Sequence, residues 1–210
     1  YLEIIVLCRS AAVISFCFEN SVGLIAAIVG KDNDRGDFME SIWRQSVYTK
    51  KRPTLSSDIS TDVAIIGAGM AGVLIGWFLK EHGIDSVILE ASKIGGGQTE
   101  NTTAKITAQH GDVYHTLIEK FGKDKAFEYA KANLAAVDDY YNLIKKLDID
   151  CHFQYRPSYI YSANDRENIK KEIEACIELG LPAEFTIKTS LPFSVEGAAV
   201  LPNQAQFNPL

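Results

Sequence analysis

The clearest hydrophobic pattern in this chain lies between residues 61 and 90. An apolar run at residues 63–66 has the length of a buried parallel strand, and a similar run follows at residues 87–89. Between the runs, apolar side chains recur at the three- and four-residue spacing of one helix face: Val73, Leu74, Trp77 and Phe78. This helix should end near Gly83, because a left-handed residue suits a helix C-terminus. The pattern therefore predicts a βαβ unit.

Helical periodicity returns in residues 112–147, where we expect a short helix ending at Gly122 and then a longer one. Asp124 is a candidate N-cap of the longer helix. Its apolar positions step by three and four and should pack in a core: Phe127, Ala130, Leu134, Val137, Tyr141 and Ile144.

The remaining chain alternates between strand and helix signals. Residues 150–162 are aromatic and β-prone, and Pro157 within them indicates an edge strand or a break. Asp165 should cap a helix that ends at Gly180, with this apolar side: Ile169, Ile173, Cys176 and Ile177. Shorter strands are predicted at residues 185–187 and 198–201.

A glycine-rich turn connects the first predicted strand to its helix, and it reads Gly67-Ala68-Gly69-Met70-Ala71-Gly72. In such a turn the first glycine permits the sharp bend, the second lets a pyrophosphate approach the backbone, and the third lets the helix lie close to the strand. The helix N-terminus offers free N–H groups to phosphates. Glu90 follows about twenty residues later, where a carboxylate can bind ribose hydroxyls. Strand, turn, helix and acid together predict a dinucleotide site rather than a turn without a ligand.

A second candidate ligand loop follows Glu90 and runs from Gly95 to Thr103. Three consecutive glycines allow close backbone approach, and the hydroxyl and amide side chains after them can donate hydrogen bonds to a ligand. The same residues could instead form a flexible loop with a helix cap. We favour a ligand contact because the loop follows directly after the candidate ribose acid.

These segments resemble a known family. The stretches VAIIGAGMAGVLIGWFL, VILEA and GGGQTENTTAKIT are similar to FAD-dependent oxidoreductases of the D-amino-acid oxidase and glycine oxidase superfamily. The third stretch is most similar to a bacterial subgroup that carries a C-terminal Rieske iron–sulfur domain. The resemblance implies an FAD pyrophosphate at the glycine turn, the adenosine ribose at Glu90, and the second loop along the cofactor. It implies these cofactor-binding residues: Gly67, Gly69, Met70, Ala71, Gly72, Glu90, Ala91, Gly97, Gln98, Thr99, Thr102 and Thr103.

The resemblance also implies an activity. The expected enzyme oxidises the C–N bond of a small-molecule amine or amino acid by hydride transfer to the flavin, and a [2Fe–2S] Rieske cluster would lie in a further domain. No catalytic residue can be assigned. Two alternatives stay open: an NAD-dependent dehydrogenase with the same fingerprint, which Gly76 and the long second loop disfavour, and a non-catalytic cofactor-binding fragment.

The amino-acid composition limits the class of protein and the partners that it can have. Of the 210 residues, 47% are hydrophobic and 23% charged, which is typical of a globular protein, and the net charge of -6 gives no indication of a nucleic-acid partner. The four cysteines and four histidines lack metal-ligand spacing, so we expect reduced thiols, no metal site in this chain and a cytoplasmic location. The uncharged stretches near the N-terminus are shorter than the about 18 residues of a membrane span.

The expected fold class is α/β: an incomplete Rossmann-like FAD/NAD(P)-binding domain with part of an α+β substrate domain. We expect four segments: a non-native or disordered leader at 1–38, a polar arm at 39–60, the FAD-binding unit and cofactor loop at 61–110, and a helical segment with a truncated substrate domain at 111–210. Met39 would be the natural start, because codons for Arg35-Gly36-Asp37 can spell a ribosome-binding site. Two parallel strands are too few for a complete dinucleotide fold, so we expect an inactive, poorly stable fragment that by itself binds FAD weakly or not at all.

Overall fold

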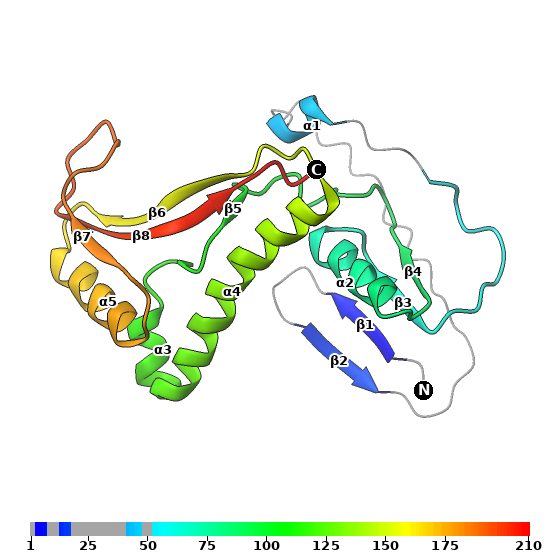
Figure 1. The fold of residues 1–210 in the computed structure, drawn as a ribbon, viewed down its shortest axis with the longest axis horizontal. Coiled ribbons are helices and arrows are strands. Elements are labelled where there is room, and N and C mark those ends of the chain that lie inside the picture. Colours follow the sequence, from blue (N-terminus) through cyan, green and yellow to red (C-terminus); the bar gives the residue numbers. More distant parts are fainter. Residues whose placement is uncertain (1–2, 8–12, 18–40, 48–51) are drawn as a thin grey trace. The chain divides into compact units, whose positions relative to one another are not determined.

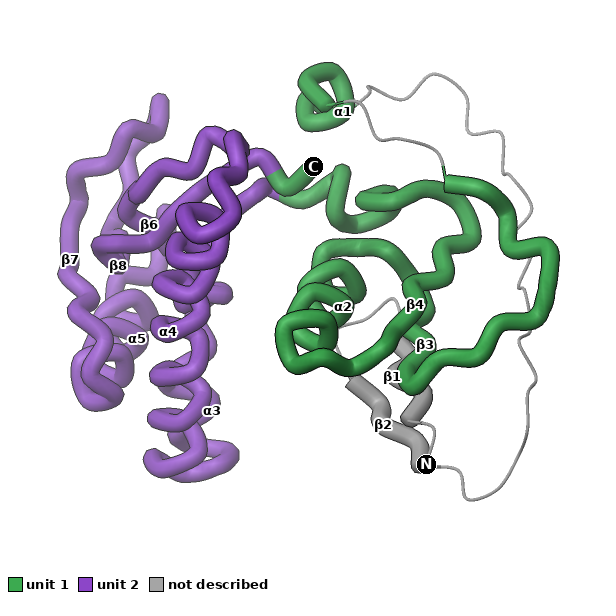
Figure 2. Tube along the Cα trace, turned by 45° about the vertical axis from the view of Figure 1, so that its right-hand side comes forward, with its two compact units in different colours: residues 1–102, 209–210 green, residues 103–208 purple. Residues whose placement is uncertain are grey.

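The computed structural model describes residues 3–7, 13–17, 41–47 and 52–210, with only the backbone of the first two ranges. The predicted leader, residues 1–38, lies outside the described residues except for these two strands. The chain divides into two compact units (Figure 2). Unit 1 comprises residues 1–102 and 209–210, and unit 2 comprises residues 103–208.

Unit 1 contains the predicted βαβ unit. Its helices and strands are β1 (Glu3–Leu7), β2 (Val13–Cys17), α1 (Ile42–Ser46), β3 (Val63–Ile66), α2 (Met70–Glu81) and β4 (Ser86–Leu89) (Figure 1). The sheet order is β2-β1-β3-β4, and β3 pairs with β4 in parallel, with Ile65 opposite Ile88. The predicted helix stop is confirmed, because Gly83 has φ 71° directly after the C-cap His82. In the arm, Ser41 caps α1 by accepting from the Trp43 N–H.

Unit 2 is a sheet packed with three helices (Figure 1). Its elements are β5 (Lys105–Ile106), α3 (Tyr114–Phe121), α4 (Lys123–Leu147), β6 (Gln154–Ser162), α5 (Arg166–Glu178), β7 (Glu184–Thr186) and β8 (Gly197–Gln206). Strand β8 lies between β6 on one side and β5 and β7 on the other, and all three pairings are antiparallel. Because β5 pairs with β8, this unit begins at Thr103, earlier than the boundary after residue 110 expected from the sequence.

Strand β6 has the interruption and the free edge that Pro157 predicted. Its pairing with β8 shifts register between Arg156 and Ser158, on either side of Pro157. Proline has no N–H to donate, so it interrupts the ladder at this position. Among the described strands, β6 pairs with β8 alone, which leaves its other side as an edge.

Three residues of the helix predictions were assigned wrongly. The N-cap of α4 is Gly122, and Asp124 lies within the first helical turn instead. Phe127 is 44% exposed, and Ile177 of α5 is 59% exposed, so neither belongs to the core. The buried faces are rotated toward Ala126 in α4 and Glu172 in α5.

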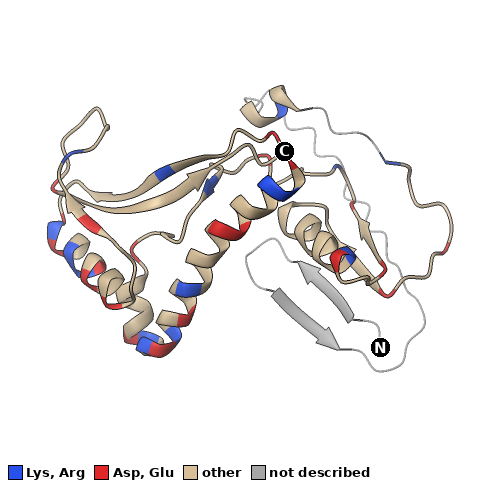
Figure 3. Ribbon diagram, in the orientation of Figure 1, with Lys and Arg blue, Asp and Glu red and all other residues tan. Residues whose placement is uncertain are grey.

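The main core of unit 2 contains buried apolar residues of all three helices and of β8, such as Tyr114, Ala130, Ile169 and Leu201. Charged residues of both signs are distributed along α4 and α5 (Figure 3). The buried Cys151 and Cys176 are both free thiols, and burial raises the pKa of Cys176 to about 12. Burial also raises the pKa of Cys151, so both thiols are neutral near pH 7.

Candidate cofactor-binding site

The glycine turn leaves the end of β3 in a conformation that glycine favours. Gly67 has φ 101°, and its N–H donates to the carbonyl of Leu89 at 2.7 Å, which ties the turn to the end of β4. A Cβ on Gly72 would lie 2.0 Å from the carbonyl oxygen of Gly67. Any side chain at residue 72 would therefore push α2 away from the strand.

Glu90, the first residue after β4, lies with its carboxylate at this turn. Its Oε2 accepts from the Ala68 N–H at 2.8 Å, and its Oε1 accepts from the Ser92 N–H at 2.8 Å. The glutamate is exposed, so its remaining lone pairs can accept from a ligand. The turn and the acid, 22 residues apart, meet at the carboxyl ends of two neighbouring parallel strands.

The N-terminus of α2 begins at this same place. Its N-cap is Gly69, which has no side chain to cap the helix. The first N–H groups of a helix have no carbonyl partner within it, and the helix dipole favours an anion there. The Met70 N–H donates to the Thr99 hydroxyl at 2.9 Å, so the second loop reaches this helix end. A Cβ on Gly69 would lie 3.3 Å from the same hydroxyl.

The second loop is fixed against the glycine turn by its backbone. The Gly95 N–H donates to the Ala68 carbonyl at 2.8 Å, and Gly97 adopts φ 65°. The side chain of Asn101 donates to the Gly97 carbonyl at 2.6 Å, which closes the loop on itself. The loop is therefore held by its own hydrogen bonds and by one to the glycine turn.

The structure thus gathers part of the predicted set at one place: Gly67, Gly69, Met70, Gly72, Glu90 and Thr99. Four others, near these residues in the sequence, are exposed: Ala71, Ala91, Gly97 and Gln98. Thr102 contributes a carbonyl that accepts from the Trp43 indole N–H at 3.0 Å. Thr103 is the first residue of unit 2.

Sequence reasoning missed the surroundings of the second loop. Glu100 is 9% exposed and lies within ion-pair distance of Arg44 and Lys93. Its position as a lone acid among hydroxyl and amide side chains is a signal that could have been used. Its partner Arg44 lies in the polar arm, more than fifty residues earlier, and no local pattern connects the two.

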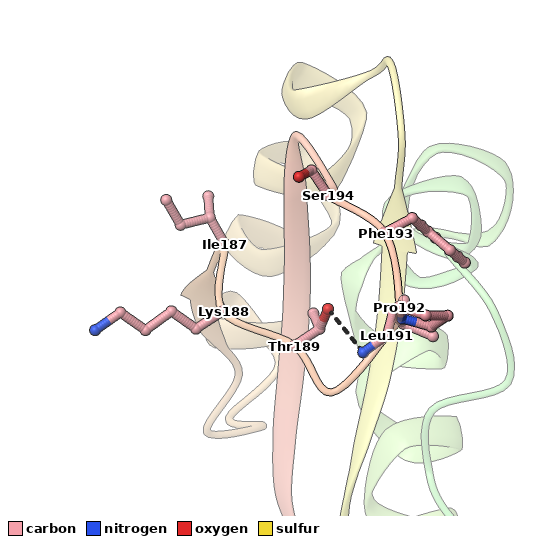
Figure 4. A pocket seen from close by; sticks show the side chains of 7 residues that line it. All are labelled: Ile187, Lys188, Thr189, Leu191, Pro192, Phe193 and Ser194. Carbon is pink, nitrogen blue, oxygen red and sulfur yellow. Dashed lines mark hydrogen bonds between the residues drawn. The ribbon is translucent and has the colours of Figure 1, made fainter.

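Unit 2 shows no comparable site. A concave surface between β7 and β8 is formed by a loop, residues 187–194, in which the Leu191 N–H donates to the Thr189 hydroxyl at 3.4 Å (Figure 4). Lys188 is its single titratable side chain, and Figure 4 shows it pointing away from the hollow. In the described ranges there is no group of three potential metal ligands and no helix long and apolar enough to cross a membrane.

Comparison with known proteins gives the family. Residues 62–210 match the family described as "DAO: FAD dependent oxidoreductase". The chain belongs to this family. The FAD-dependent class agrees with the resemblance found in the sequence and speaks against the NAD-dependent alternative.

Two curated relatives are similar to this member of the family. The chain is 35% identical over 173 residues to the "Putative Rieske 2Fe-2S iron-sulfur protein YhfW" of Bacillus subtilis (strain 168), covering 81% of this chain and 34% of the relative. It is 32% identical over 73 residues to "Gamma-glutamylputrescine oxidoreductase" of Escherichia coli (strain K12), covering 35% of this chain and 17% of that protein. The chain thus spans about a third or less of the length of each.

The fold is also found in solved structures. The L-amino acid deaminase from Proteus vulgaris superposes with a TM-score of 0.53 at 18% identity, over 76% of this chain and 37% of the deaminase. At this identity the likeness shows the fold alone. It agrees with the expected α/β class of FAD-binding enzymes.

Proposed function

We propose that the full-length protein is an FAD-dependent oxidoreductase that oxidises the C–N bond of an amine or amino acid. The observation that carries the cofactor part is the Glu90 carboxylate at 2.8 Å from the Ala68 N–H, at the tip of the glycine turn. The amine part is supported by the family and by the name of the similar Escherichia coli protein, which acts on gamma-glutamylputrescine.

The residues at the turn fit FAD by three features. Gly67 and Gly72 hold the backbone in a shape that a side chain at residue 72 would destroy. The first turn of α2 presents N–H groups toward a pyrophosphate, as helix N-termini do in dinucleotide sites. Glu90 offers acceptors to the ribose hydroxyls, while Thr99 places a hydroxyl at the same helix end.

The role of this chain in the reaction is to bind and orient the cofactor. When bound, FAD would supply the hydride acceptor, as flavins do in oxidoreductases. The exposed Ala91, Gly97 and Gln98 would lie along the cofactor beyond the pyrophosphate. Thr102 and Thr103 would follow at the end of the loop.

Absorption spectra of the purified full-length protein test the cofactor. We expect flavin bands in the visible spectrum, release of FAD on denaturation, and no uptake of NAD under the same conditions. Gly72→Val should lack the flavin, whereas Gly83→Ala, at a glycine distant from the turn in sequence, should keep it. A colourless wild-type protein that binds NAD instead would contradict the proposal.

Anaerobic mixing with amines and amino acids tests the substrate class. A substrate should bleach the flavin bands, and the imine product should release ammonia or an amine on hydrolysis. Hydroxy acids of matched size, which lack the C–N bond, serve as controls. Bleaching by hydroxy acids and not by amines would move the activity to a C–O bond.

We further propose that the full-length protein carries a Rieske [2Fe–2S] cluster outside the present chain. The support is the similarity to the protein of Bacillus subtilis whose name includes this cluster. Iron and acid-labile sulfide in equal amounts, with a Rieske-type electron paramagnetic resonance signal after reduction, are expected from the full-length protein. Iron-free protein that still binds flavin would reject this part alone.

A further inference from the structure

The polar arm makes specific contacts with the cofactor loop. The Trp43 indole N–H donates to the Thr102 carbonyl at 3.0 Å, and the Ser41 hydroxyl donates to the Glu100 carbonyl. The Arg44 guanidinium binds the Glu100 carboxylate through two nitrogens, one of them 2.6 Å from Oε1. Side chains of three neighbouring arm residues thus hold two residues of the loop.

Glu100 is the centre of these contacts. Its side chain is 12% exposed, and a buried carboxylate is costly unless it is paired and hydrogen-bonded. Arg44 supplies a two-pronged contact from the arm, and Lys93 adds an ammonium at 2.8 Å from within the loop region. A bidentate arginine–carboxylate contact fixes the orientation of the two side chains and also pairs their charges.

The contact matters because of the residue next to Glu100. Thr99 is 9% exposed, and its hydroxyl accepts from the Met70 N–H in the first turn of α2. Holding both the backbone and the side chain of Glu100 restricts where the adjacent hydroxyl can lie. The arm thereby acts on the helix end where we place the pyrophosphate.

We infer that Trp43 and Arg44 are positioning residues, which hold the cofactor loop so that Thr99 stays at the N-terminus of α2. The inference rests on the proposed FAD binding. Preorganisation of the loop lowers the conformational cost of binding, so loss of the arm contacts should weaken affinity for the cofactor. An arm that merely stabilises the fold would instead lower the melting temperature and leave that affinity unchanged.

Flavin titration of the full-length apoprotein tests the inference. We expect Arg44→Met to raise the FAD dissociation constant by roughly tenfold, measured by quenching of flavin fluorescence. Trp43→Phe, which keeps an aromatic side chain and removes the N–H donor, should raise the dissociation constant by about threefold, since one hydrogen bond is lost. Arg52→Met is the matched control, because Arg52 is an exposed arginine of the same arm.

Two further variants separate positioning from general stability. Arg44→Lys keeps the charge and should recover part of the lost affinity. The double variant Arg44→Met with Glu100→Gln should bind FAD no more weakly than the worse single variant, because both changes remove the same contact. Trypsin should also cut the apoprotein near Lys93 faster in Arg44→Met than in Arg52→Met.

The outcomes distinguish this inference from the proposed function. If the wild-type protein binds no FAD, both fall. If the wild-type protein binds FAD and Arg44→Met binds it with the same constant as Arg52→Met, the inference alone is wrong. A higher FAD dissociation constant in Arg44→Met, with partial recovery in Arg44→Lys, supports the inference. This holds also where Arg44→Met and Arg52→Met have equal melting temperatures.

Discussion

The two units of this protein differ in what fills their interiors. In unit 2, residues of three helices and of β8 form a continuous core around Tyr114, Ile169 and Leu201. In the described part of unit 1, the buried apolar residues are Ile65 and Ala68. Unit 2 thus has the buried core of a self-supporting domain, whereas few apolar side chains are buried in the described part of unit 1.

In unit 1, the candidate binding residues instead surround the glycine turn. Three apolar side chains of its βαβ unit, Ile66, Val73 and Phe78, are 43–53% exposed. The glycines of the turn (Gly67, Gly69 and Gly72), Glu90 and Thr99 lie together at the end of β3 and the start of α2. From this difference we expect the stability of unit 1 to depend on its bound cofactor. Unit 2 should fold independently of the cofactor.

The largest expected effect is in unit 1. Gly72→Val places a Cβ 2.0 Å from the Gly67 carbonyl oxygen, so α2 must move away from the turn. We expect at least a hundredfold weaker FAD binding in the full-length protein, measured by flavin titration. Amide exchange in the core of unit 2, for example at Leu201, should stay as slow as in the wild type.

Gly83→Ala is the control for this change. Gly83 has a positive φ, of 71°, and a Cβ there would meet nothing within 4 Å. The substitution should cost about 1–2 kcal/mol of stability through backbone strain and leave flavin affinity unchanged. Equal loss of flavin in both variants would show that general destabilisation, not the turn, controls binding.

Leu201→Ala should give the largest loss of stability in unit 2. The side chain is 1% exposed at the centre of the core, and such truncations cost about 2–5 kcal/mol. Chemical denaturation measures the loss, with Ile177→Ala as a matched control because Ile177 projects into solvent. Similar losses in the two variants would mean that the core is wrongly assigned.

Glu172→Ala should rank next. The Glu172 carboxylate of α5 is fully buried and accepts from the Tyr114 N–H at 2.9 Å, the His115 N–H at 3.1 Å and His115 Nδ1 at 2.7 Å. Its loss leaves buried donors of α3 without an acceptor, which costs about 1–3 kcal/mol. Amide exchange at Tyr114 and His115 should accelerate, and Glu172→Gln, which keeps an acceptor, should show a smaller change. Unchanged exchange in Glu172→Ala would refute this role.

The smallest effect is expected at a helix cap. Asp165 accepts from the Asn168 N–H at 2.9 Å, and its replacement by alanine should cost about 1 kcal/mol in denaturation experiments. Asp124→Ala provides the comparison, since Asp124 lies in the first turn of α4 and is not its cap. A larger loss for Asp124 would reverse the assignment.

The sequence predicted the local elements well, because their signals are local. Apolar runs located β3 and β4, and glycines located the ends of α2, α3 and α5. The sequence failed to predict features that depend on contacts between residues far apart in the chain. Ile177 fits the helix period but is exposed, because Glu172 turns inward to bind α3. Likewise, β5 is too short to recognise without its partner β8.

The candidate site likewise has a part that the sequence predicted and a part that it did not. The glycine turn and Glu90 follow one sequence fingerprint, and the structure places them together. The contact between Thr99 and Met70 was not predicted, because only the fold brings a loop hydroxyl to that helix end. The Arg44–Glu100 pair joins residues more than fifty positions apart, and a single sequence holds no record of such a pairing.

The strands at the ends of unit 2 run side by side, since β5 near its start pairs with β8 near its end and the Phe207 N–H donates to the Ala104 carbonyl at 3.2 Å. A segment whose entry and exit are neighbours can be exchanged as one piece, as domain insertions are. Residues 103–208 therefore form a natural cassette for chimaeras among homologues. Such grafts would replace this half of the chain and leave the glycine turn of unit 1 untouched.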